Sequence, residues 1–283
     1  MPEPASKNTA LRNESIWQRL YSIKSDNPDL KPDNWCSVQP CKTYTIFGAK
    51  VLITQPSSTF WVYLLGLITC LLGIYFIATE GDQVSRLLWG WSLILWGIVA
   101  LLAGTSYQAF GYQLKCKGRE EVAWTSWWEV VYLVFQQLSV SIMLLAIAYS
   151  GLSETGRLIA IFAAALSSTI YTALVVYGAF KPVKALITFE LMVHFCTPFI
   201  VFCIALNGWR YWQFGQTLDL ALLGSNLALV LTMYLYEKYM ALGITNTLWK
   251  KGTWFSENDV LHVALIAWVI YLALVVEPLV SDL

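Results

Sequence analysis

Seven long apolar runs constrain this chain more than any other feature of its sequence. Each run has about 20 mostly apolar residues, the length that an α-helix needs to cross a bilayer. Glycine, proline and charged residues collect between the runs. We therefore predict an all-α bundle of seven transmembrane helices. The predicted spans are approximately 59–79, 87–110, 124–150, 158–180, 185–206, 218–239 and 259–279.

The composition agrees with an integral membrane protein. Hydrophobic residues make up 57% of the chain and charged residues only 13%, whereas soluble domains average about 25% charged residues. The 18 basic and 18 acidic residues cancel, so we expect membrane lipids, or other membrane-protein subunits, as partners and no nucleic acid.

The beginning of the chain has no apolar core of the length that a secretory signal requires. We therefore expect no cleavable signal peptide, and a place in a bacterial inner membrane or a thylakoid membrane. The joints after the second, fourth and sixth spans hold eight Lys and Arg residues, against three in the joints after the first, third and fifth. The positive-inside rule then predicts a cytoplasmic N-terminus and an outside C-terminus.

Residues 1–58 are predicted to form a polar cytoplasmic segment ahead of the seven-helix domain, residues 59–283. Within this segment, Trp17 and Leu20 belong to a short apolar pattern at helical spacing, which favours a helix on the membrane surface. The stretch TYTIFGAKVLIT predicts a β-hairpin about Gly48, lying against the mouth of the bundle.

The six cysteines are too few and too scattered for a disulfide scaffold. Cys36 and Cys41, in WCSVQPC, are the only close pair, and no histidine lies near them to complete a zinc site. We expect both to be free thiols on a reducing side of the membrane.

Polar residues recur in the cytoplasmic half of several spans. Glu190 and His194 are four residues apart and Asp259 and His262 three apart, so each pair shares a helix face. Ionisable groups in membrane helices normally face the bundle interior or water. We therefore predict a water-accessible polar pocket on the cytoplasmic side. Its candidate residues are Thr105, Ser106, Gln108, Glu129, Glu190, His194, Asp259 and His262.

Simpler roles compete for the same residues. Ser256 and Asp259 fit a capping box at a helix start, and Glu129 lies near the interface, where a carboxylate can reach water. His194 and His262 each fit a buried histidine paired with Glu129 or Glu190.

Three stretches together resemble a known arrangement: VLITQPSSTF, AGTSYQAFGY and ENDVLHVALIAW. They are similar to those of uncharacterised bacterial seven-helix proteins, themselves similar to the superfamily of alkaline ceramidases and progestin and adipoQ receptors. The resemblance implies a seven-helix fold and a zinc ion held by three histidines, which activates water for attack on a lipid amide.

This chain departs from that zinc pattern. The position that closes the second span is Tyr107 or Gln108, and the last span supplies only His262 where the superfamily has two histidines. Zinc catalysis needs at least three protein ligands. His194 and a carboxylate would have to complete the set.

A second seven-helix class is the rhodopsins, whose retinal is attached to a lysine midway through the last span. Residues 259–283 contain no lysine. The sequence therefore excludes a covalently bound retinal.

Three functions remain open. The first is a non-enzymatic protein that binds a lipid or other apolar ligand in the polar pocket, or docks a larger membrane complex. The second is a metal-dependent lipid hydrolase, with ligands from His194, His262, Asp259 and Glu190, and Glu129 or Asp259 as the catalytic carboxylate. The third is a proton or ion carrier that uses the same carboxylates.

Overall fold

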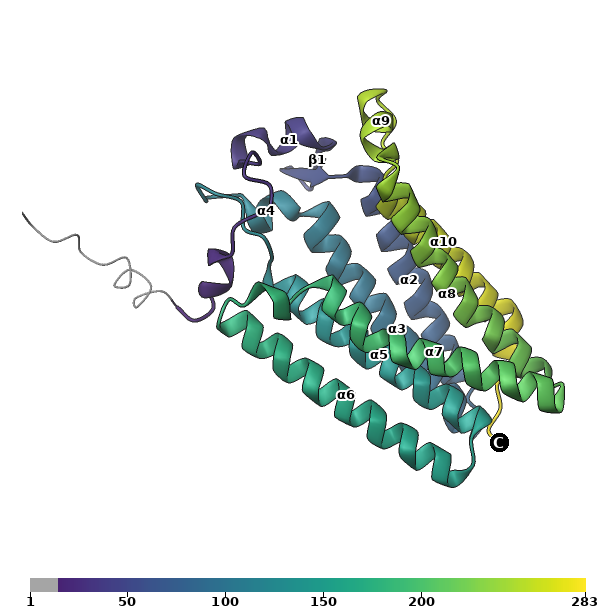
Figure 1. Ribbon diagram of the computed structural model, residues 1–283. Helices are drawn as coiled ribbons and strands as arrows, with labels where there is room; N and C mark the ends of the chain where they lie inside the picture. The colour runs from purple at the N-terminus through teal and green to yellow at the C-terminus, as the bar shows by residue number, and fades with distance from the viewer. Residues whose placement is uncertain (1–14) are drawn as a thin grey trace, which may run out of the picture.

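The computed structural model describes residues 15–283, in which seven helices are long and apolar enough to cross a membrane (Figure 1). The prediction of seven spanning helices in an all-α bundle is confirmed, whereas their orientation in the membrane stays a prediction. The helices are α2 (Pro56–Ala78), α3 (Val84–Ala103) with its π-helical continuation η4 (Gly104–Ala109), α5 (Trp127–Gly151), α6 (Glu154–Phe180), α7 (Phe189–Phe214), α8 (Thr217–Ala241), and α10 (Glu257–Tyr271) with η6 (Leu272–Val276) and η7 (Glu277–Leu279).

Polar residues inside the spans are accommodated within the helices. Helix α8 continues through the Gly224–Asn226 stretch, where the Asn226 side-chain amide donates to the carbonyl of Leu222 one turn earlier, at 2.8 Å. Helix α7 likewise continues through Pro198. Both helices are long enough to cross the bilayer without a break.

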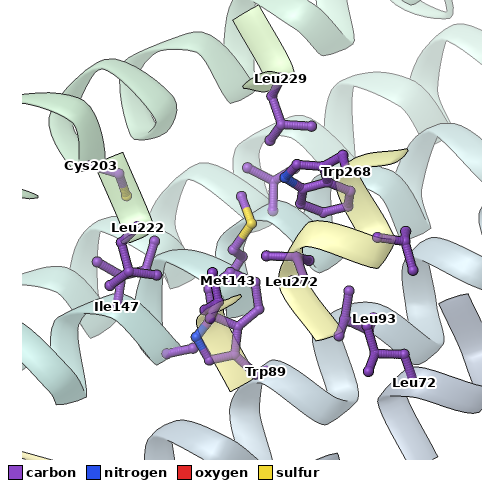
Figure 2. Packing of buried hydrophobic residues seen from close by; sticks show 14 of the residues in the cluster. Leu72, Trp89, Leu93, Met143, Ile147, Cys203, Leu222, Leu229, Trp268 and Leu272 are labelled. Carbon is purple, nitrogen blue, oxygen red and sulfur yellow. The ribbon is translucent and has the colours of Figure 1, made fainter. Parts of the chain in front are cut away.

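Six of the spanning helices form a ring. Helix α5 packs against α3, α3 against α2, α2 against α10, α10 against α8, α8 against α7, and α7 returns to α5, while α6 lies outside against α5 (Figure 1). Side chains from all six of these helices meet in the apolar core (Figure 2). Trp89, Met143, Leu222 and Trp268 are among its buried members.

The loops divide between two ends of the bundle. We call the end with residues 15–55, 110–126, 181–188 and 242–256 the N-terminal end, and the end with residues 79–83, 152–153, 215–216 and 280–283 the C-terminal end. Short helices η5 (Lys184–Leu186) and α9 (Ile244–Lys250) lie in loops of the N-terminal end.

Buried ion pairs and caps fasten the C-terminal end. Arg210 donates to Asp219 at 2.8 Å, and Arg86 pairs with Glu277. The Asp282 carboxylate accepts the backbone N–H groups of Val84 and Ser85, at 2.9 and 2.8 Å, and so caps the first turn of α3. These contacts join α7 to α8, and join α3 to the end of the last span and to the residues that follow it.

The beginning of the described chain does not form the predicted surface helix. It contains only a 3₁₀ turn, η2 (Arg19–Ser22), with Leu20 fully buried. The Trp17 ring packs against Trp127 and Phe180, with centroids 4.8 and 5.3 Å apart, at the ends of α5 and α6. The helix prediction is wrong for the described residues, where Leu20 packs into the protein and only one 3₁₀ turn forms. The expectation about a signal peptide concerns a stretch that falls partly on residues 1–14, outside the described ones.

The predicted hairpin is confirmed. Strands β1 (Cys41–Ile46) and β2 (Ala49–Thr54) pair antiparallel around Phe47 and Gly48, both with positive φ, as a two-residue hairpin turn requires. The hairpin lies against the mouth of the bundle, since Thr54 donates to the carbonyl of Gln108 in η4. Gln113 of α4 (Gly111–Lys115) donates to the carbonyl of Leu52 at 2.6 Å.

A disulfide joins Cys36 and Cys41, so the expectation of two free thiols is wrong. Cys36 lies in the single-turn helix α1 (Trp35–Val38), which follows η3 (Pro32–Asn34), and Cys41 begins β1. The reversal between α1 and β1 brings the two Cα atoms to 5.4 Å, within the range of disulfides. Sequence spacing alone does not reveal this reversal.

Candidate functional site

Asp259 lies in the first turn of α10 and is fully buried. Its carboxylate accepts hydrogen bonds from Ser57 Oγ at 2.6 Å and from Ser58 Oγ at 2.8 Å, both in the first turn of α2. It also accepts from the backbone N–H of Ser256 at 2.6 Å and from Ser256 Oγ at 2.8 Å. Four donors therefore surround one carboxylate.

These four bonds make Asp259 a structural residue. The two oxygens of a carboxylate offer about four acceptor positions, and the serines of α2 and α10 occupy as many. The capping box with Ser256 is present, as the helix-start interpretation predicts. Asp259 in addition ties the first turn of α10 to the first turn of α2.

His262 lies almost one turn further along α10 and is buried, with 7% of its surface exposed. Its Nδ1 atom is buried and has no hydrogen-bond partner within residues 15–283. The predicted pairing with Glu129 or Glu190 is therefore not seen at this nitrogen.

Glu129 belongs to a different cluster, at the start of α5. It is 3% exposed and accepts from Ser106 Oγ of η4 at 2.7 Å and from Thr125 Oγ1 at 2.9 Å. Lys115 of α4 completes the cluster with a buried ion pair to Glu129. The carboxylate thus points into protein and not to water, in contrast to the simpler interpretation of its place near the interface.

The three candidates in η4 turn in different directions. Ser106 joins the Glu129 cluster and also contacts Ser126 Oγ at 2.6 Å. The Thr105 hydroxyl lies 2.8 Å from the hydroxyl of Tyr63 in α2. Gln108 uses its backbone carbonyl to accept from the hairpin, while its side-chain oxygen is buried without a partner among the described residues.

Glu190 and His194 belong to neither cluster. Both lie on an exposed surface of α7, and His194 Nδ1 is 2.6 Å from the carbonyl oxygen of Glu190 in the same helix. The spacing correctly predicted a shared helix face, but this face does not point into the polar interior.

The described residues do not provide the predicted metal site. Among residues 15–283, no group of three or more His, Cys, Asp and Glu side chains is placed to bind a metal ion. Asp259 is enclosed by serines, His262 is buried near it, and His194 and Glu190 lie on the exposed surface of α7. The zinc site implied by the superfamily resemblance, which needs three converging ligands, does not fit this arrangement.

A pocket of about 340 Å³ opens at the N-terminal end of the bundle, between the loop after α1 and helix α9. Its walls combine two tryptophans, a lysine and several uncharged polar groups. The lining residues are Ser37, Val38, Gln39, Pro40, Asn246, Trp249, Lys250 and Trp254. None of the eight site candidates predicted from the sequence lines this pocket.

The floor of the pocket leads toward Asp259. Pro40, Trp249 and Trp254 also border a narrow gap, too small for a water molecule, whose other walls include Ser57 and Ser58. These serines donate to Asp259. The structural cluster therefore supports the base of the pocket without opening into it.

The Asp259 cluster gives a first prediction. Asp259→Asn replaces one acceptor oxygen by a donor facing buried donors, and we expect it to lower the free energy of unfolding by about 2 kcal/mol. Unfolding in mixed micelles with increasing SDS measures the change. Asn258→Ala is the matched control, because Asn258 lies in the same turn and its side chain makes no hydrogen bond within the described residues. Equal effects of the two substitutions would contradict the role given to Asp259.

The relation to the ceramidase and adipoQ receptor superfamily stays a prediction for this chain. Comparison of the chain with protein-family models, with curated proteins and with solved structures finds no match.

Proposed function

We propose that this integral membrane protein is a non-catalytic binder of an amphiphilic ligand, which occupies the pocket between the loop after α1 and helix α9. The observation that carries the proposal is the combination of Trp249, Trp254 and Lys250 around one cavity of about 340 Å³. Ligand pockets typically measure about 300–1,000 Å³ and combine apolar walls with a few polar groups.

The lining indicates the chemistry of the ligand. Tryptophan has a large apolar ring and one N–H donor, which suits the region where lipid headgroups meet acyl chains. Lys250 supplies a positive charge, and Gln39 and Asn246 supply amide donors and acceptors. Among residues 15–283, no carboxylate lines the pocket. An amphiphile with an anionic headgroup, such as an acidic phospholipid, matches this lining best.

The buried carboxylates support binding rather than catalysis. A nucleophilic serine in a hydrolase is activated by a base, commonly a histidine that a third group orients. Here Ser57 and Ser58 donate directly to Asp259, and Glu129 is engaged by Lys115 and hydroxyl groups. Both carboxylates therefore serve the packing of helix ends in our proposal.

Binding of radiolabelled phosphatidylglycerol to the detergent-solubilised protein tests the proposal, with phosphatidylcholine as the zwitterionic comparison. We expect Lys250→Gln to weaken phosphatidylglycerol binding about ten-fold, because it removes a charge-assisted contact. Trp254→Ala should weaken binding of both lipids by a similar factor, through loss of apolar contact.

Lys251→Gln is the matched control, since Lys251 is exposed next to Lys250 but does not line the pocket. It removes the same charge from the same loop. Similar losses in the Lys250 and Lys251 variants would indicate general electrostatic attraction and would contradict the proposed site. Unchanged binding in Trp254→Ala would contradict it as well.

A further inference from the structure

One wall of the pocket is a loop that the disulfide closes. The four residues between Cys36 and Cys41 are Ser37, Val38, Gln39 and Pro40, and all four line the pocket. The opposite wall comes from α9 and the residues after it. The shape of the pocket therefore depends on whether Cys36 and Cys41 are joined.

The charge distribution predicts a reducing environment for this disulfide. Of the Lys and Arg residues that the structure describes, thirteen lie at the N-terminal end of the bundle or in its hairpin, and three lie at the C-terminal end. The positive-inside rule thus predicts that the N-terminal end faces the cytoplasm. Disulfides in a cytoplasm are rare, and those that occur are usually transient, catalytic or redox-sensing.

The disulfide is open to attack from solution. Cys36 is exposed and Cys41 is half-buried. Cys116, a free thiol, is buried in the small apolar cluster against which Cys41 packs. Burial raises the pKa of the Cys116 thiol to about 11, so this thiol stays protonated at neutral pH and is a poor nucleophile. Any exchange at this disulfide therefore needs an external thiol.

We propose that the Cys36–Cys41 disulfide is a redox modification site, which holds the pocket wall in its binding form and releases it when a dithiol reduces the bond. A thiolate of the reductant attacks the Cys36 sulfur, and the electron pair of the broken bond leaves with the Cys41 sulfur, which takes up a proton. The second thiol of the reductant resolves the mixed disulfide, so that Cys36 becomes a thiol and the reductant becomes a disulfide.

Other contacts keep the two ends of the loop in place after reduction. Trp35 stays packed against Cys116 and Val122. At the other end, the Gln55 backbone N–H donates to the carbonyl of Pro40 at 2.7 Å, and Gln55 Nε2 donates to Gln39 Oε1 at 2.8 Å. Reduction is thus expected to loosen Ser37 and Val38 without unfolding the hairpin.

The link to binding rests on the proposed function, so the experiment has two readouts. The full chain is placed in phosphatidylcholine nanodiscs with oxidised or reduced dithiothreitol, and maleimide labelling confirms the state of the cysteines. Hydrogen exchange followed by mass spectrometry reports on the amides of residues 36–39, with the hairpin amides as internal reference. Binding of radiolabelled phosphatidylglycerol is measured in the same two states.

We expect reduction to speed exchange of residues 36–39 about ten-fold, because the cross-link no longer restricts this loop. Phosphatidylglycerol binding should weaken by a similar factor, since the pocket wall is no longer preorganised. The Cys36→Ser/Cys41→Ser double variant should resemble the reduced protein in both readouts and should not respond to dithiothreitol.

Each other outcome is decisive. Unchanged exchange after both cysteines become labelled would overturn the redox site. Faster exchange with unchanged phosphatidylglycerol binding would overturn its control of the pocket. Absence of phosphatidylglycerol binding to the oxidised protein would instead overturn the proposed function, and the exchange data alone would then decide whether reduction loosens the loop.

Discussion

Replacing Gly73 by valine is expected to prevent the close packing of α2 against α3 and to lower the free energy of unfolding by about 4–5 kcal/mol. A Cβ atom at Gly73 would lie 2.7 Å from the carbonyl oxygen of Gly90 and 2.8 Å from the backbone nitrogen of Ile94. Both obstacles are backbone atoms, so a rotamer change cannot relieve the overlap. The helices would have to separate.

A second close approach of α2 and α3 lies about two helical turns away along the same pair of helices. A Cβ atom at Gly97 would lie 2.7 Å from the carbonyl oxygen of Gly66. Glycines on both helices are thus seven residues apart and face each other, as in membrane helix pairs whose backbones touch through small residues. Gly73→Val should therefore disturb the contact that joins the first two spans along much of its length.

Gly208→Val is the matched control, because Gly208 also lies inside a spanning helix but a Cβ atom there would meet a single side-chain atom, at 4.0 Å. We expect it to change stability by less than about 1 kcal/mol. SDS unfolding in mixed micelles and the yield of monodisperse protein measure both variants. Comparable losses for Gly73 and Gly208 would show that valine is harmful in any span, and that the α2–α3 contact has no special tightness.

Sequence patterns predicted the number and approximate bounds of the spanning helices, because the bilayer requires a run of apolar residues of fixed length. They did not reveal which helices touch. The spacing of Gly66 and Gly73, and of Gly90 and Gly97, is visible in the sequence, but without coordinates nothing indicates that these two glycine pairs face one another. The hairpin was predicted for a local reason, the Phe47–Gly48 turn between β-prone runs.

The candidate site was predicted less well than the fold. Position along a span gives the depth of a residue, and depth was the basis for grouping Glu129, Glu190 and Asp259. Depth does not determine the direction in which a side chain points around the helix axis. Ser57 and Ser58 bind Asp259 from about 200 residues away in the chain, and a contact of this kind has no local signature.

The pocket was missed for a related reason. Its lining comes from residues 37–40 and 246–254, which are loops and short helices with no apolar periodicity. The available signals were the close cysteine pair in WCSVQPC and the tryptophans beside lysines in LWKKGTW. Either stretch alone is common at a membrane interface. Only the fold brings them together.

Removing the partner of a buried charge gives the second large effect. Glu129→Gln is expected to lower the free energy of unfolding by about 3–5 kcal/mol, because Lys115 keeps its charge while only 9% of its side chain reaches solvent. The glutamine amide can still accept a bond from Ser106, so the loss reports mainly on the unpaired ammonium group. The same SDS unfolding assay measures it.

Replacing both partners separates an unpaired charge from a general packing defect. In Lys115→Met/Glu129→Leu no buried charge remains, and we expect most of the lost stability to return, since apolar groups of similar volume often replace a buried ion pair with little or no loss. Lys24 and Glu121 provide the comparison at the same end of the bundle, because their side chains are 71% and 60% exposed. Their double-mutant cycle should give a coupling energy of at most about 1 kcal/mol. A Lys115/Glu129 double variant no more stable than Glu129→Gln would mean that the shape of the cluster, and not its charge balance, holds α4 against α5.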